Sequence, residues 1–286
     1  MTNGALVLSG GGVAGIAWET GVLLGIQDVE PSTAMKILGA PTALVGTSAG
    51  AAVAAQVAGG TLLQELFDAQ LADDTAELFV EIDLAAFGAM MAEAMAGATS
   101  PEETRRRLGA MALAAQTPSP AARRAVIEAR LAGNEWGDRS LRVTAVDAES
   151  GELRVFDRDS GVSLVDAVMA SCAVPGIWPV VEINGHKYMD GGIRSTSNAD
   201  LAAGADPVLI ITPSTEQTPM GPAVPASELD ALAPARVHVV YADAASIASF
   251  GLNPLDPGVR KPAALAGREV GRRVAAEVAA FWDRPR

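Results

Sequence analysis

Two short apolar runs in the first sixty residues each lead through a glycine-rich turn into a segment of helix formers. Residues 5–8 (Ala-Leu-Val-Leu) precede Ser9-Gly10-Gly11-Gly12, and residues 43–45 (Ala-Leu-Val) precede a turn at residues 46–50. Helices are predicted after these turns, at about 14–27 and 49–57. Strands that are apolar on both faces are typical of a parallel sheet covered by helices. The sequence therefore predicts an α/β fold with a three-layer α/β/α core and a mostly parallel sheet.

The alternation of strands and helices stops between residues 62 and 131, where Ala, Glu, Leu, Met, Arg and Gln predominate. These residues are good helix formers, so we expect a helical insertion at about 62–131. Two hairpins are predicted after it, over residues 141–156 and 180–189. The second contains the Asn184-Gly185 pair, which favours a type I′ turn.

The last third of the chain completes the predicted α/β domain. Residues 208–211 and 237–241 have the composition of strands, and we expect the proline-rich connection at 215–234 to be a mobile surface loop. An amphipathic helix is predicted at about 262–282. Because no repeat or linker divides the chain, and 286 residues suit one large α/β domain, we expect a single domain over residues 1–286.

Charge and cysteine content exclude several classes of function. The chain has 21 Lys and Arg against 34 Asp and Glu, and its net charge of −13 repels the phosphate backbone of nucleic acids. We therefore expect no nucleic-acid partner. Cys172 is the single cysteine, so no disulfide can form within the chain. The first basic residue is Lys36, too late for a secretory leader, and we expect a cytoplasmic protein.

The pentapeptide Gly46-Thr47-Ser48-Ala49-Gly50 has the G-x-S-x-G pattern and lies between a predicted strand and a predicted helix. A nucleophilic serine must stand clear of its own backbone, which requires a strained turn, and the flanking glycines leave room for neighbouring chain there. The start of the following helix directs N–H groups toward developing negative charge. Ser48 is therefore a candidate nucleophile, although a small-residue turn in an alanine-rich chain would look the same.

The glycine-rich loop after the first strand has two interpretations. Gly10, Gly12 and Gly15 satisfy G-x-G-x-x-G, the fingerprint of dinucleotide-binding folds. Those folds also need an acidic residue at the end of the second strand, which here runs into Ser48 instead. In the other interpretation, the N–H groups of Gly10, Gly11 and Gly12 form an oxyanion hole that faces Ser48.

A serine nucleophile needs a base, and the chain offers His186, His238 and several carboxylates. His186 lies in the predicted hairpin turn and His238 lies within an apolar strand, where a histidine is more often a structural residue. Asp190 precedes two glycines near a strand end, which is where α/β enzymes present catalytic groups. Desolvation would have to raise its basicity, because the ordinary pKa of Asp is about 3.9. A triad of Ser48, Asp190 or Asp206, and His238 remains the rival arrangement.

Four motifs in order resemble the patatin-like phospholipase family over about residues 5–211. They are the loop from Gly10 to Gly15, the pentapeptide around Ser48, the block Ala170-Ser171-Cys172-Ala173-Val174-Pro175, and Asp190-Gly191-Gly192. The resemblance implies a patatin-like fold, a catalytic Ser48–Asp190 dyad without histidine, an oxyanion hole from Gly10, Gly11 and Gly12, and hydrolysis of lipid acyl esters. It implies a supporting role for residues 170–175, and no metal or cofactor.

The sequence departs from the family pattern at Ala14, where many members carry Arg or Lys, and at residues 197–199, which follow the usual Asn-Pro only loosely. The substrate is accordingly predicted only as a lipid carboxylic ester, whether phospholipid, lysophospholipid or neutral lipid. Acidic composition argues against purely electrostatic docking, which leaves transient contact with a membrane surface open. The alternatives are a Ser-His-Asp esterase and a non-catalytic lipid- or nucleotide-binding protein.

Overall fold

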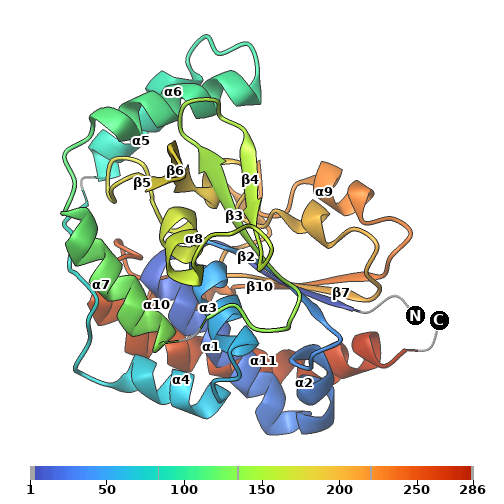
Figure 1. Cartoon of the computed structure of the whole chain (residues 1–286). Coiled ribbons are helices and arrows are strands. Elements are labelled where there is room, and N and C mark those ends of the chain that lie inside the picture. Colours follow the sequence, from blue (N-terminus) through green and yellow to red (C-terminus); the bar gives the residue numbers. More distant parts are fainter. Residues whose placement is uncertain (1–3, 83, 134, 220, 285–286) are drawn as a thin grey trace.

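The computed structural model describes residues 4–82, 84–133, 135–219 and 221–284 (Figure 1). Its strands are β1 (Ala5–Leu8), β2 (Ala43–Thr47), β3 (Leu141–Asp147), β4 (Leu153–Phe156), β5 (Val181–Ile183), β6 (His186–Asp190), β7 (Val208–Thr212), β8 (Gln217–Thr218), β9 (Gly221–Pro222) and β10 (Val237–Tyr241). Its α-helices are α1 (Gly12–Val29), α2 (Pro31–Ile37), α3 (Ala49–Ala58), α4 (Leu63–Leu71), α5 (Leu84–Met95), α6 (Pro101–Ala114), α7 (Pro120–Leu131), α8 (Leu164–Ser171), α9 (Ala226–Ala231), α10 (Ala244–Ser249) and α11 (Arg260–Trp282). Short 3₁₀ turns are η1 (Gly191–Ile193), η2 (Ala199–Ala202) and η3 (Pro257–Val259).

The main sheet has the strand order β10-β7-β1-β2-β3-β6-β5, with β4 paired to the other side of β3. Strands β10, β7, β1, β2 and β3 are parallel, whereas β4 and β6 are antiparallel to β3. The predicted hairpins are β3–β4 and β5–β6. The prediction of an α/β fold with a mostly parallel sheet is confirmed.

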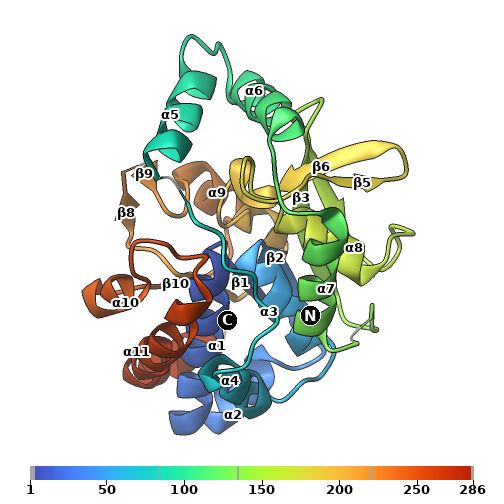
Figure 2. The ribbon, with the colours of Figure 1, turned by 90° about the vertical axis from the view of Figure 1, so that its left-hand side faces the viewer.

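Helices cover both faces of the sheet, because its central strands alternate buried side chains between the two sides. Leu6 and Leu8 belong to the larger core, together with residues of α1, α3, α8 and α11. Ala5 and Val7 belong to a second core, which η2 and α9 cover. Figures 1 and 2 show α1 and α11 on one side of the strands and α9 on the other. The three layers are present, and one outer layer is much thinner than the other.

The helical insertion consists of α4, α5, α6 and α7, with an extended stretch at residues 72–82 between α4 and α5. Figures 1 and 2 place α5 and α6 at the end of the molecule remote from α2 and α4. Helix α4 packs against α1 and α11, and α7 packs against α8. The insertion therefore joins the main core at both of its ends.

The expectation of a mobile surface loop at residues 215–234 is wrong. Its described residues form β8, β9 and α9, and the side chains of Ala223, Val224 and Leu232 are buried. Val224 and Leu232 pack in the second core, and this burial explains why the proline-rich segment is ordered. Helices α2 and α10 were also absent from the sequence prediction.

Helices α1 and α11 approach each other closely at glycine residues, where no side chain lies between the two backbones. A Cβ at Gly267 would lie 2.1 Å from the carbonyl oxygen of Trp18, and one at Gly21 would lie 2.2 Å from that of Ala264. Any larger residue must push the helices apart, because both obstructing atoms belong to rigid helical backbone.

Replacing Gly267 by alanine is therefore expected to lower the free energy of unfolding by about 3 kcal/mol. Chemical denaturation monitored by circular dichroism measures this loss. Gly88→Ala is the matched control, because Gly88 lies in α5 with no atom within 4 Å of its added Cβ. The control should gain about 0.5–1 kcal/mol from helix propensity. Equal effects of the two substitutions would contradict close packing of α1 on α11.

Candidate active site

Ser48 lies at the turn between β2 and α3 with φ 53° and ψ −113°, a left-handed backbone conformation that is strained for a residue with a side chain. The glycines on either side have no room for a Cβ. At Gly50 it would lie 2.1 Å from the carbonyl oxygen of Leu8, and at Gly46 it would lie 2.5 Å from Cα of Ala51. The pentapeptide therefore forms the strained strand-to-helix turn that its pattern predicts.

The glycine-rich loop lies directly beside this turn, where the N–H of Gly50 donates a hydrogen bond to the carbonyl of Ser9. Gly12 has φ +66° and begins α1. Among the described residues, the hydrogen bonds do not use the N–H groups of Gly11, Gly12 or Ala49. These three donors come from the starts of α1 and α3, where the helix dipoles favour negative charge.

Gly10, which the sequence predicts to donate to an oxyanion, forms a backbone hydrogen bond within the protein. Its N–H donates to the carbonyl of Thr196 at 2.8 Å, so this donor is already occupied. Gly10 still approaches the serine closely, since a Cβ there would lie 3.5 Å from Cβ of Ser48. Gly10 thus ties the loop to the segment that follows η1, and the unoccupied donors are those of Gly11 and Gly12.

A buried carboxyl group supports the same loop from behind. Glu19 of α1 is fully buried, and its Oε1 accepts a hydrogen bond from the N–H of Ser9 at 2.9 Å. Burial raises the pKa of Glu19 well above its usual range, although the hydrogen bond from Ser9 lowers it. Burial thus disfavours a negative charge on Glu19 beneath the loop.

Asp190 meets Ser48 because two strands end facing each other along β3. Parallel strand β2 ends with Thr47 opposite Thr144, and antiparallel strand β6 ends with Asp190 opposite Ala145. The hydroxyl of Ser48 donates to Oδ2 of Asp190 at 2.7 Å, and the N–H of Gly192 donates to Oδ1 at 2.7 Å. Two residues 142 positions apart are thereby in direct contact.

The environment of Asp190 changes its acidity. The residue is 4% exposed, and burial raises its pKa to about 6, against the hydrogen bonds from Ser48 and Gly192 and the charge of Arg123, which lower it. The Asp190 carboxylate is therefore a stronger base than an exposed one, yet it is ionised at neutral pH. A group with these properties can accept a hydroxyl proton.

Residues 170–175 hold the backbones of both Ser48 and Asp190. The Ser48 N–H donates to Oγ of Ser171 at 2.8 Å, and the Cys172 thiol donates to the Ser48 carbonyl at 3.2 Å. The N–H of Asp190 donates to the carbonyl of Ala173 at 2.9 Å. Burial raises the pKa of Cys172, which remains a thiol. This segment sets the separation of the two reactive groups.

Asn198 is a further buried residue that the sequence did not single out as functional. It has φ 47°, and its side-chain amide donates to the Ser195 carbonyl at 2.6 Å and to Oγ1 of Thr47 at 3.1 Å. It links the chain after Asp190 to the end of β2. Its position within the family's Asn-Pro region was the only signal in the sequence.

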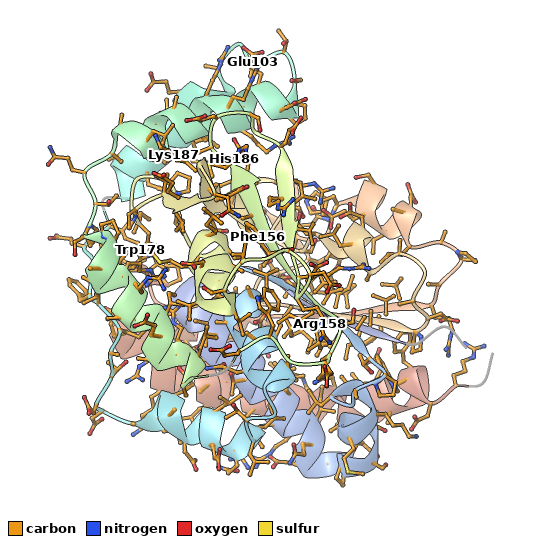
Figure 3. The ribbon with its side chains drawn as sticks, in the orientation of Figure 1. Glu103, Phe156, Arg158, Trp178, His186 and Lys187 are labelled. Carbon is orange, nitrogen blue, oxygen red and sulfur yellow. The ribbon has the colours of Figure 1, made fainter. Side chains whose placement is uncertain are left out.

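Neither histidine approaches Ser48. His186 is exposed on the β5–β6 hairpin, 3.1 Å from Asp147. Figure 3 labels His186 and Lys187 at this hairpin. His238 lies on β10, where it pairs with Leu209 of β7 and lies beside Glu277 and Phe281. Three strand spacings, or about 14 Å, separate β10 from β2. Asp206 precedes β7 and pairs with Arg236. It therefore lies at the N-terminal ends of the parallel strands, whereas Ser48 lies at their C-terminal ends. The rival triad is therefore not assembled.

A small cavity of about 10 Å³ lies beside Ser48. Its lining combines the start of α1, both arginines on the inner side of α7, and apolar side chains; it consists of Gly12, Val13, Ile16, Ser48, Ala49, Arg123, Arg130, Cys172, Val174, Trp178 and Leu255. A cavity of this size holds about one water molecule. It has no space for a nucleotide, and an ester substrate requires side chains such as Leu255 to move.

Larger cavities lie elsewhere in the molecule, and one of them shares lining residues with this cavity. The first, of about 390 Å³, shares Val13, Ile16 and Arg130 with it and extends toward α4. The second, of about 300 Å³, lies between α5 and the loop at Gly176 and Ile177. In the described parts of the chain, no group of three His, Cys, Asp or Glu side chains is arranged to hold a metal ion. Among the described helices, none combines the length and apolarity needed to cross a bilayer.

The site thus combines a serine on a strained turn above an α/β sheet with a buried carboxylate that accepts its hydrogen bond. The family model of patatin-like phospholipases matches residues 6–203, which is more than half of the chain. The chain belongs to this family of lipid acyl hydrolases. No curated protein matches the sequence.

Two solved structures show distant similarity. VipD from Legionella pneumophila is 14% identical with a TM-score of 0.46, over 97% of this chain and 67% of that one. The type III effector protein ExoU is 17% identical with a TM-score of 0.45, over 96% of this chain. The chain spans only 53% of the length of ExoU.

Proposed function

We propose that this chain cleaves carboxylic esters of lipids, with Ser48 as nucleophile and Asp190 as general base. The hydrogen bond of 2.7 Å from the Ser48 hydroxyl to the buried Asp190 carboxylate carries the proposal, because it joins a strained serine to a base. Ser48 Oγ attacks the ester carbonyl while Asp190 Oδ2 takes its proton. The product of this step is a tetrahedral intermediate with a negatively charged oxygen.

The N–H groups of Gly11 and Gly12 are proposed to bind that oxygen, with the N–H of Ala49 as a further donor. Gly10 completes the loop by holding it against Thr196. Losing one such donor typically lowers kcat by about 10²–10³-fold.

The second half of the reaction uses the same groups in reverse. Asp190 returns its proton to the leaving alkoxide, and the alcohol departs from the acyl-enzyme. Water then attacks the Ser48 ester, gives a proton to Asp190, and the proton passes back to Ser48 Oγ as the carboxylic acid leaves. The residues described here can carry out every proton transfer in this sequence.

Labelling with a fluorophosphonate tests the assignment of the nucleophile. Peptide mass spectrometry should find the adduct on Ser48 alone, because the adjacent base activates only that hydroxyl. An adduct on another serine, or none at pH values where Asp190 is ionised, would contradict the proposal.

His238→Ala separates the proposed dyad from the rival triad. Turnover of a p-nitrophenyl ester by this variant is expected to remain within about threefold of wild type, because His238 does not take part in proton transfer. The control is His186→Ala, which removes the other histidine from an exposed position. A loss of activity in His238→Ala as large as that in Ser48→Ala would restore the triad.

A further inference from the structure

Arg123 is a buried cation in the wall of the cavity that contains Ser48. It lies on the inner face of α7, together with Val126 and Ile127, and its side chain is 3% exposed. Its guanidinium lies over the Trp178 ring, 3.9 Å from the ring centre. Figure 3 shows the labelled Trp178 beside α7. The ring fixes the arginine against one wall of the cavity.

Two nitrogen atoms of the Arg123 guanidinium lack an acceptor in the described part of the chain. Among the described residues, its Nε and Nη1 are buried and form no hydrogen bond. Buried polar groups in native proteins nearly always have partners, and a buried charge without one is costly. A guanidinium retained in this state is explained by a ligand that completes it.

The neighbouring charges do not neutralise Arg123. Glu77 binds Arg130 through two hydrogen bonds, of 2.6 Å and 2.7 Å. Burial alone would lower the pKa of Arg130, but Glu77 raises it. Burial and the charge of Arg130 together lower the pKa of Arg123 to about 10, against the nearby acidic groups, which raise it. Arg123 is thus still charged at neutral pH, and among the described residues the carboxylates of Glu77 and Asp190 act on it through charge alone, without a hydrogen bond.

We propose that Arg123 is a specificity-determining residue that binds an anionic group of the substrate, a phosphate or a carboxylate, next to the ester that Ser48 attacks. The inference rests on the proposed function. A guanidinium presents paired N–H donors that match both oxyanions, and the bond is strong in a cavity without water.

Kinetics of Arg123→Met on paired substrates test this role. The pair is a lysophospholipid, which carries a phosphate, and a neutral monoacylglycerol with the same acyl chain. At a pH well above the pKa of Asp190, the variant should lose about 10- to 100-fold in kcat/KM on the lysophospholipid, mainly through KM. On the neutral ester it should stay within about threefold of wild type. Arg123→Lys, which keeps the charge but not the fork, should recover part of the loss.

Arg124→Met is the matched control, because it removes the adjacent positive charge from the same helix. Arg124 is partly exposed and pairs with Asp166 and Glu128 on the outside of α7. It should leave both substrates unchanged. Equal losses on both substrates in Arg123→Met, or no loss on either, would overturn the inference.

Binding to the Ser48→Ala variant provides a second measurement that needs no turnover. Calorimetry with dodecyl phosphate, laurate and dodecanol is expected to show tighter binding of the phosphate or the carboxylate than of the alcohol, and the stronger of the two identifies the group. Adding Arg123→Met should remove that preference. Retention of the preference would refute the role of Arg123.

These measurements distinguish a failure of the proposed hydrolase function from a failure of the role proposed for Arg123. If wild type neither hydrolyses esters nor reacts with fluorophosphonate, the proposed function fails, and the binding experiment still decides whether Arg123 recognises an anion. If Ser48 reacts normally and the substrate pair shows no selective loss, only the role of Arg123 is wrong. Thermal melting of Arg123→Met should show no loss of Tm, since replacing an unpaired buried charge by an apolar side chain is seldom destabilising.

Discussion

Replacing Ser48 by alanine is expected to lower kcat on an acyl ester by about 10⁵-fold or more. The substitution removes the only atom that can form the acyl-enzyme in the proposed mechanism, and the glycine-loop donors alone retain little rate enhancement. Folding should be almost unaffected, because alanine occupies the same volume apart from one oxygen. Steady-state hydrolysis of a p-nitrophenyl ester, with burst kinetics of the wild type, measures the effect.

Ser249→Ala is a suitable control for this experiment. It removes a hydroxyl from α10, where Ser249 bonds to the carbonyl of Ser246 and has no role in the site. Its activity should equal that of wild type. Should Ser48→Ala retain even one tenth of the activity, acyl transfer through Ser48 would have to be abandoned.

Replacing Asp190 by asparagine is expected to lower kcat by about 10³–10⁴-fold and to abolish the acid limb of the pH profile. In the proposed mechanism, kcat/KM of the wild type depends on ionised Asp190, whose pKa is about 6. The rate constant should therefore rise about tenfold per pH unit below that value and become constant above it. Asparagine cannot accept the proton, so its residual rate should lack this limb.

The stability of the same variant has a distinct pH dependence. Folding raises the pKa of Asp190 from 3.8 to about 6, so the folded state binds this proton more tightly. The stabilisation is complete at pH values below the unfolded pKa and is lost as the pH rises through the folded one. The Tm of Asp190→Asn relative to wild type should therefore increase between about pH 4 and pH 7. The control Asp206→Asn should keep both the kcat and the acid limb of the wild type. An identical pH–rate profile in the Asp190 and Asp206 variants would exclude Asp190 as the base.

Strands β1 and β2, the two glycine turns and the place of Ser48 could be predicted because they depend on local sequence. Apolar runs of four and three residues, each followed by a glycine-rich turn, determine β1 and β2, and the turn between β2 and α3 requires no distant partner for its shape. Asp190 was assigned through family resemblance and its loop position. Its contact with Ser48 arises from the register of β2 and β6 along β3, which no local pattern encodes.

Several features of the site depend on contacts between distant segments. The hydrogen bond from the N–H of Gly10 to the carbonyl of Thr196 joins the loop after β1 to the segment after η1. It occupies one of the N–H groups that the sequence predicts as donors of the oxyanion hole. The support from Ser171 and Cys172 was expected only in outline. Arg123 did leave a trace in the sequence, because it occupies a position three residues before Val126 on the apolar stripe of α7. A charged residue on such an apolar stripe indicates a buried charge, which is a candidate for a functional role.

The close packing of α1 and α11 has a consequence for where this protein can be shortened. The family match ends at residue 203, yet β7, β10 and α11 all follow it. A polypeptide stopped there would leave β1 as an unprotected sheet edge and uncover the glycine-lined side of α1, whose first turn bears Gly11 and Gly12. Truncation at the family boundary should therefore yield an aggregating fragment rather than a minimal enzyme, because β7, β10 and α11 belong to the scaffold of the candidate site.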